Sequence, residues 1–149
     1  MEQLALIALD EFLKVVPGKR VMYTSHVSHE WSALQIALGE AASMIEAAEL
    51  IFYRAADDVD AHARRGEKMP MKLRGRIRMD ITTVPRLCRD AVQKLLTMGG
   101  AAGLSLKSPI QLNFRNLQAT TMHGLLLEEA GAEIYGRVLL GVDPGTPLV

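Results

Sequence analysis

The sequence has a single cysteine, Cys88, among its 149 residues. One cysteine excludes an internal disulfide framework and a cysteine-rich metal site, and it is typical of proteins in a reducing compartment. Cys88 lies among apolar residues on a predicted helical face, so we interpret it as a small buried hydrophobic residue. The cysteine content therefore favours the cytoplasm.

Net charge is also absent, because 17 Lys and Arg residues balance 17 Asp and Glu residues. Without an overall basic field, nucleic acid and anionic membrane surfaces are disfavoured as partners. No apolar run approaches the roughly 20 residues of a membrane-spanning helix. Glu2 and Asp10 stand where a secretory signal would have basic residues. We expect no nucleic-acid partner, no membrane segment and a cytoplasmic location.

Metal-ligand clusters are scarce. His26 and His29, three residues apart, could reach one metal ion, but no carboxylate or cysteine accompanies them at ligand spacing. We therefore assign both histidines to the surface and predict no metal site.

Helical periodicity fills the chain, and no segment shows the alternation of a strand with hairpin turns. We predict helices over residues 4–16, 29–65, from 70 to the glycine pair at 99 and 100, and 109–140. The stripe expected on the second helix consists of Leu34, Leu38, Ala41, Ile45, Ala48, Phe52, Ala55 and Val59. The predicted fold is all-α: an up-and-down antiparallel four-helix bundle with long helices, forming a single domain over residues 1–149.

A basic cluster extends from Lys72 to Arg78 at the start of the third predicted helix. It could bind phosphate or nucleic acid, but acidic residues of the preceding antiparallel helix are available as partners. With no net positive charge, we interpret the cluster as a solvated or interface face.

The loop before the fourth predicted helix combines glycines with a helix start. Gly99 and Gly100 are suited to positive φ and end the preceding helix. Ser108 as N-cap, Pro109 at the first helical position and Gln111 predict a capping box. The free N–H groups of this helix start, beside Lys107, could bind an anion. From these residues alone, a helix-loop-helix corner is the preferred interpretation.

His123 lies where the apolar register of the fourth predicted helix shifts, around residues 122–124. A histidine at such a position is more often a partly buried residue bonded to a neighbour than a catalyst. Spacing alone therefore predicts a structural role.

The order of several short motifs resembles a known family. These motifs are Ala8-Leu9-Asp10-Glu11-Phe12, Leu38-Gly39-Glu40-Ala41-Ala42, Arg54-Ala55-Ala56-Asp57, Gly99-Gly100, Ser108-Pro109-Ile110-Gln111, Phe114-Arg115-Asn116 and Tyr135-Gly136-Arg137-Val138-Leu139-Leu140-Gly141. Together they resemble the C-terminal helical domain of the acyl-CoA dehydrogenase fold, in the branch of two-component flavin-dependent monooxygenases. The resemblance covers nearly the whole chain.

This resemblance implies roles for individual residues. Gly99, Gly100 and Ser108 fall on positions near the flavin, often that of a neighbouring subunit, and His123 falls on a histidine near the reactive edge of the isoalloxazine. The implied catalytic residue is His123, and the implied cofactor is FMN or FAD, bound only in a complete enzyme or assembly.

The chain also departs from the family pattern. Leu112 and Gln118 replace an arginine and a histidine of many members, and Thr121-Met122-His123-Gly124 replaces the Tyr-Glu-Gly-Thr motif of true dehydrogenases. The N-terminal helical domain and the middle β domain of the family have no counterpart in these 149 residues.

Two functions follow as hypotheses. The first is the C-terminal domain of a flavin-dependent monooxygenase, which contributes one wall of the flavin and substrate site and the oligomer interface. Its partners would be copies of itself, the missing flavoenzyme domains or a flavin reductase. The second is a stand-alone helical bundle that binds a small hydrophobic ligand or a partner chain without redox chemistry.

Overall fold

The computed structural model describes residues 1–21 and 23–149, and helices dominate both parts. The α-helices are α1 (Glu2–Val15), α2 (Ser32–Arg65), α3 (Met71–Gly99), α4 (Pro109–Thr121) and α5 (Glu128–Leu139). Three short 3-10 helices accompany them: η1 (Ser28–Glu30), η2 (Ala101–Leu104) and η3 (Gly124–Leu126). The all-α prediction is confirmed. Along these described residues, none of the helices has the length and hydropathy needed to cross a membrane.

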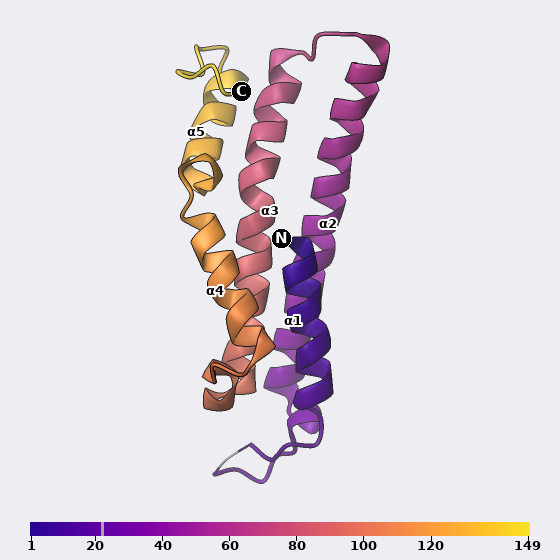
Figure 1. The fold of residues 1–149 in the computed structure, drawn as a ribbon, viewed down its shortest axis with the longest axis vertical. Helices are drawn as coiled ribbons and strands as arrows, with labels where there is room; N and C mark the ends of the chain where they lie inside the picture. The colour runs from indigo at the N-terminus through magenta and orange to yellow at the C-terminus, as the bar shows by residue number, and fades with distance from the viewer. Residues whose placement is uncertain (22) are drawn as a thin grey trace.

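A long hairpin of α2 and α3 forms the frame of the molecule (Figure 1). Gly66 ends α2 in the left-handed region at φ 64°, and Pro70 is the N-cap of α3. The positive φ at Gly66 is available to glycine at little cost, so the chain can turn sharply between the two helices.

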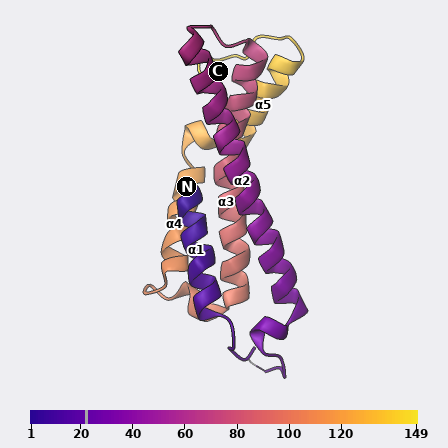
Figure 2. The same cartoon turned by 90° about the vertical axis from the view of Figure 1, so that its right-hand side faces the viewer.

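Helix α3 occupies the centre, with the other four α-helices packed around it (Figures 1 and 2). Its buried residues therefore lie on several faces: Gly75, Ile77, Arg78, Asp80, Thr82, Val84, Pro85, Cys88, Ala91, Val92, Leu95 and Leu96. Small residues on the neighbouring helices, such as Ala8 of α1 and Ala48 of α2, are fully buried and permit close approach.

The prediction of one helix over residues 109–140 is wrong, because the segment is divided into α4 and α5 by η3. Leu117 of α4 and Ile134 of α5 are both buried. On one continuous straight helix, Leu117 and Ile134 would lie on different faces, so one of the two would turn away from the core. The break allows both stripes to be buried.

The predicted stripe of α2 is buried along only part of its length. Leu34, Ala41 and Ile45 are buried, whereas Phe52 and Val59 are 50% and 41% exposed. Helix α1 runs beside one half of α2 and leaves the other half uncovered (Figure 1). The expectation of burial at Phe52 and Val59 is therefore wrong, because α2 extends beyond α1.

Two glycine contacts join α3 to α5. A Cβ on Gly75 would lie 3.1 Å from Val138 Cβ, and a Cβ on Gly131 would overlap Thr82 Oγ1 and lie 2.9 Å from Thr82 Cγ2. The contacts are seven residues apart on each helix, in opposite directions, as expected for antiparallel helices in close contact. Space rather than φ requires glycine at position 131, whereas a Cβ at position 75 would need Val138 to move by a few tenths of an ångström.

We predict that Gly131→Ala lowers the free energy of unfolding by about 1–3 kcal/mol, because Thr82 is fully buried and β-branched and cannot make room by rotating. Gly136→Ala, on the same helix with open space around it, is the control and should be neutral or stabilising by up to about 1 kcal/mol. Urea unfolding of both variants tests this. Equal effects would contradict the close contact.

Candidate functional site

The residues singled out from the sequence lie at the two ends of α4. Ser108 precedes the helix and Gly99 and Gly100 close α3 beside it, whereas His123 follows the other end. Since α4 has 13 residues, these ends are about 20 Å apart. The structure thus brings the glycine pair and Ser108 together and keeps His123 separate from them.

A cavity of about 270 Å³ lies at the glycine end of α4. It is lined by Glu11, Val15, Val16, Lys19, Gly99, Ala102, Gly103, Ser105, Lys107, Ser108, Pro109 and Ile110. Gly100 has φ 71°, as predicted, but Gly99 is still helical, so only one glycine of the pair takes a positive φ. Lys107 and the start of α4 give this cavity a basic and N–H-donating side.

Ser108 is the N-cap residue of α4 by its backbone, and Pro109 follows at the first helical position. The Ser108 carbonyl accepts a hydrogen bond from the Leu112 N–H at 3.2 Å. Its side chain makes no capping hydrogen bond, so the predicted capping box is wrong. The loop instead holds the Ser108 backbone by a hydrogen bond from its N–H to the Ser105 carbonyl, at 2.8 Å.

His123 is the N-cap of η3 and is exposed. Its Nδ1 accepts a hydrogen bond from the Leu125 N–H at 3.3 Å. A neutral imidazole that accepts at Nδ1 carries its proton on Nε2. The expectation of partial burial is wrong, because the helix breaks here and the histidine lies on a surface turn. The arrangement presents an Nε2–H group that can donate a hydrogen bond.

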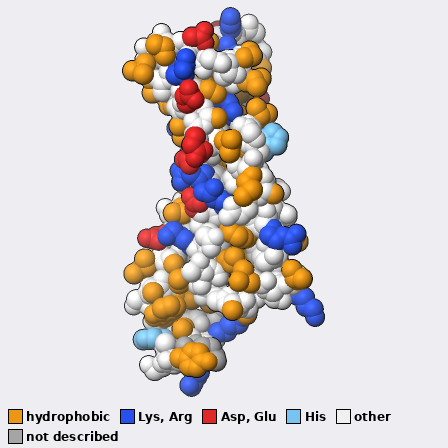
Figure 3. Space-filling view, turned by 90° about the vertical axis from the view of Figure 1, so that its left-hand side faces the viewer, with side chains coloured by type: hydrophobic (Ala, Val, Ile, Leu, Met, Phe, Trp, Pro, Cys, Tyr) orange, Lys and Arg blue, Asp and Glu red, His pale blue; other side chains and the backbone are white. Residues whose placement is uncertain are grey.

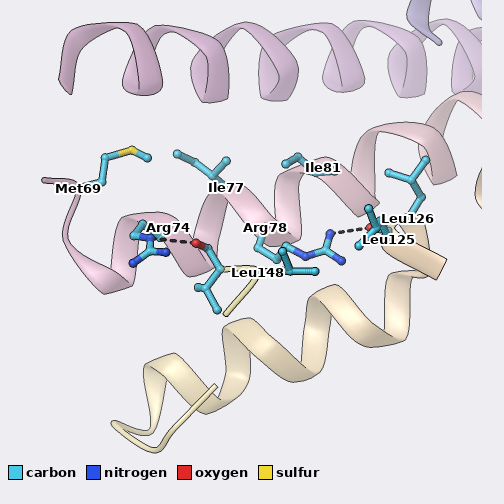
Figure 4. A pocket seen from close by; sticks show the side chains of 9 residues that line it. Met69, Arg74, Ile77, Arg78, Ile81, Leu125, Leu126 and Leu148 are labelled. Atoms are coloured by element: carbon cyan, nitrogen blue, oxygen red, sulfur yellow. Dashed lines mark hydrogen bonds between the residues drawn. The ribbon is translucent and has the colours of Figure 1, made fainter. Parts of the chain in front are cut away.

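An apolar groove of about 440 Å³ lies beside η3, between α3 and the C-terminal residues (Figure 4). It is lined by Met69, Arg74, Ile77, Arg78, Ile81, Leu125, Leu126, Leu148 and Val149. Sequence reasoning missed this groove. No sequence signal marks it, because the exposure of its apolar lining, such as Ile81 at 44%, depends on which elements cover α3.

The basic cluster of α3 is divided between two sides of the helix. Arg76 forms an ion pair with Asp58 of α2, and Asp80 accepts a hydrogen bond from Arg54 of α2 at 2.9 Å. The predicted pairing with the preceding helix is therefore confirmed for this side. Arg78 is buried and turns away, since residues two apart on a helix do not face each other. The interpretation as a solvated or interface face is wrong for Arg78.

Cys88 is fully buried in the core, as predicted. Burial raises the pKa of its thiol from 9.0 to about 11. A thiol of this pKa stays protonated near neutral pH, and the thiolate is the reactive form. Cys88 is therefore part of the packing and no nucleophile.

Residues 4–128 match the family model described as acyl-CoA dehydrogenase, C-terminal domain. The chain is 28% identical to the flavin-dependent monooxygenase, oxygenase subunit HsaA, of Mycobacterium tuberculosis (strain CDC 1551 / Oshkosh), over 85% of this chain and 36% of that protein. It is 24% identical to a pigment production hydroxylase of Rhodococcus sp. (strain ATCC 21145), over 95% of this chain and 36% of that protein.

Solved structures match over nearly the whole chain. XiaF from Streptomyces sp., in complex with FADH2 and glycerol, has a TM-score of 0.94 at 26% identity, covering 99% of this chain and 38% of that one. The 3-HSA hydroxylase from Rhodococcus sp. RHA1 has a TM-score of 0.88 at 26% identity, with the same coverage. The chain therefore spans little more than a third of the length of these relatives.

We predict that Ser108→Ala changes the free energy of unfolding by less than about 0.5 kcal/mol, because the hydroxyl caps nothing. Gly100→Ala should cost about 1–3 kcal/mol, since φ 71° with ψ −171° is a backbone region that essentially only glycine adopts. Thermal unfolding of the two variants measures both. A loss of more than about 1 kcal/mol in Ser108→Ala would indicate a capping role after all.

Proposed function

The chain belongs to the acyl-CoA dehydrogenase C-terminal domain family, and from this premise we propose that it is the C-terminal helical domain of a flavin-dependent monooxygenase. In this role it supplies one wall of the flavin and substrate site. The observation that carries the proposal is the TM-score of 0.94 with XiaF, which was solved with FADH2, over 99% of this chain.

The proposed cofactor is FMN or FAD, held only when further domains or chains complete the site. The residues present fit one side of such a group. The cavity lined by Gly99 and Ser108, with Gly100 next in the chain, offers Lys107 and the N–H groups of a helix start. A ligand site normally encloses most of the ligand surface. The two ends of α4 are too far apart for one isoalloxazine ring to touch both, so the nucleotide part or the flavin of a second subunit would occupy the glycine end.

His123 is the proposed acid-base residue of the reaction. A reduced flavin supplies the activation of dioxygen when it is bound. The chain's own contribution is the imidazole of His123, whose Nε2–H can donate a hydrogen bond to the reacting oxygen. To transfer the proton itself, the ring must first be protonated at Nδ1, which breaks the bond from the Leu125 N–H; it then gives up the Nε2 proton and is left neutral. Because His123 is exposed on this chain, the missing domains would have to exclude water from it.

The apolar groove beside η3 extends this wall. Its Ile77, Ile81, Leu125 and Leu126 side chains suit an apolar portion of a substrate. The same groove is the observation that favours the second candidate function, binding of a small hydrophobic ligand without redox chemistry. A His123 substitution in the complete enzyme separates the two functions, because it leaves the groove unchanged. Loss of flavin-dependent turnover in that variant would favour the monooxygenase domain over the ligand-binding bundle.

We further propose that residues 1–149 form one domain, an up-and-down antiparallel bundle in which α4 and α5 together take the place of the fourth helix. The proposed partners are copies of the chain, the remaining domains of the flavoenzyme and a flavin reductase. The cytoplasm stays a prediction from the cysteine content.

Self-association is supported by apolar side chains at the surface. Leu6, Ile7, Leu13 and Val15 of α1 are each at least 36% exposed, although α1 also buries Ala5, Ala8 and Phe12. Hydrophobic side chains also reach the surface between charged groups on the face that Figure 3 shows. Helices that are apolar around most of their circumference usually pack against further protein.

We predict that the 149-residue chain sediments as a dimer or larger species at high micromolar concentration, because these side chains remain to be covered. Analytical ultracentrifugation over a concentration series measures this. Ile7→Lys, at a position 48% exposed, should weaken the association without unfolding the chain. A well-behaved monomer throughout the series would contradict the proposal.

We predict that His123→Asn in the complete enzyme lowers the ratio of hydroxylated product to hydrogen peroxide by about 10²-fold, the lower range for loss of a general acid-base group. His29→Asn, at an exposed histidine on η1, is the control. Product and peroxide are measured per reduced flavin consumed. An unchanged ratio with an intact fold would make His123 structural.

A further inference from the structure

Arg78 reaches from the central helix to the turn that carries His123. Its guanidinium Nη1 donates a hydrogen bond to the Leu125 carbonyl at 2.6 Å (Figure 4). The residue is only 9% exposed, although arginine is rarely buried without a partner. A charged donor on a neutral carbonyl forms a stronger bond than two neutral groups do.

Two other arginines of α3, Arg76 and Arg86, have carboxylate partners. Arg76 pairs with Asp58, and Arg86 lies 2.6 Å from Glu128 Oε1. Within residues 1–21 and 23–149, no carboxylate lies within ion-pair distance of Arg78. The partner of the buried Arg78 guanidinium is therefore the Leu125 carbonyl of η3 rather than a carboxylate.

The same residue, Leu125, also holds the imidazole. Its N–H donates to His123 Nδ1 at 3.3 Å, and its carbonyl accepts from Arg78. The backbone of His123 is held as well, since its carbonyl accepts from the Leu126 N–H at 2.7 Å and its N–H donates to the Thr120 carbonyl at 3.1 Å. Both polar backbone groups of Leu125 are thus used between Arg78 and His123.

The turn depends on such a link because it has little packing of its own. None of the residues of η3 is buried, and Leu125 is 49% exposed. A three-residue 3-10 turn is weakly stabilised by its own hydrogen bonds. Helix α3, by contrast, is surrounded by the other helices, so it offers a rigid support for the guanidinium.

We propose that Arg78 is a positioning residue for His123: by holding the Leu125 carbonyl it orients the Leu125 N–H toward Nδ1, which keeps the imidazole in one orientation with its proton on Nε2. An effect of this positioning on catalysis rests on the proposed acid-base function of His123. The positioning itself is a property of this chain and can be measured without flavin.

The first test uses the unmodified 149-residue chain labelled with ¹⁵N. At mildly alkaline pH, where imidazole is neutral, the His123 ring should show an unprotonated, hydrogen-bonded Nδ1 and a protonated Nε2. A scalar coupling between the Leu125 amide nitrogen and Nδ1 should be detectable across the hydrogen bond. A protonated Nδ1, or equal averaging of the two tautomers, would overturn the proposal.

The second test compares two arginines of α3. Arg78→Met should abolish the coupling and speed exchange of the Leu125 amide with solvent at least about tenfold, because the turn opens locally. Arg74→Met is the matched control: Arg74 lines the same groove and donates to the Val149 carbonyl at 2.9 Å, but it has no hydrogen bond to η3. It should leave the Leu125 and His123 signals as in the unmodified chain.

Arg78→Lys keeps the positive charge and a hydrogen-bond donor, so it should retain part of the coupling. It also serves as the test variant if Arg78→Met does not fold. The proposal would be overturned if Arg74→Met and Arg78→Met changed the Leu125–His123 coupling and the Leu125 amide exchange equally. It would also be overturned if Arg78→Met and Arg78→Lys both folded and changed neither quantity.

In the complete enzyme, Arg78→Met should lower the product-to-peroxide ratio with little change in KM. If His123→Asn leaves that ratio unchanged while the NMR results hold, the proposed function fails and the positioning stands.

Discussion

The burial of α3 among the other four α-helices is the constraint on which the rest of this structure depends. A helix that is covered on several sides must offer small residues where a neighbour approaches closely, and α3 has Gly75, Cys88 and Ala91 buried at such places. It must also satisfy the polar groups that it buries. Asp80 is held by Arg54, and the buried Thr82 hydroxyl donates to the Met79 carbonyl. Helices α4 and α5, which flank the turn that carries His123, both pack on this helix.

Periodicity and end signals in the sequence were sufficient to predict most of the helices. The predicted end of the second helix, Arg65 before Gly66, agrees with the end of α2, because a glycine with φ 64° stops a helix by local backbone chemistry. The family, identified from the order of the motifs, is confirmed by the match over residues 4–128. Helix ends and motif order can be recognised in a single sequence, because neither depends on tertiary contacts.

The features that sequence reasoning could not predict depend on distant neighbours. The division between α4 and α5 allows Leu117 and Ile134 both to be buried, and this depends on where α3 lies, because α4 and α5 both pack on it. The exposure of Phe52 depends on where α1 stops alongside α2. In each case tertiary structure overrode a correct local signal.

The candidate site shows the same division. The residue types came from the resemblance, but the separation of about 20 Å along α4 required the structure. Arg78 carried no signal beyond membership of a basic cluster, because its role depends on a carbonyl 47 residues later in the chain. We propose a domain that presents these residues on one wall of a flavin site whose enclosure comes from other protein.

That account is tested most directly by titrating the 149-residue chain with FMN, FAD and their reduced forms while flavin absorbance and fluorescence are followed. Since the cavity beside Ser108 is only about 270 Å³ and His123 is exposed, we expect weak binding or none. A stoichiometric yellow complex with a sub-micromolar Kd would contradict the account, because the chain alone would then build a complete flavin site.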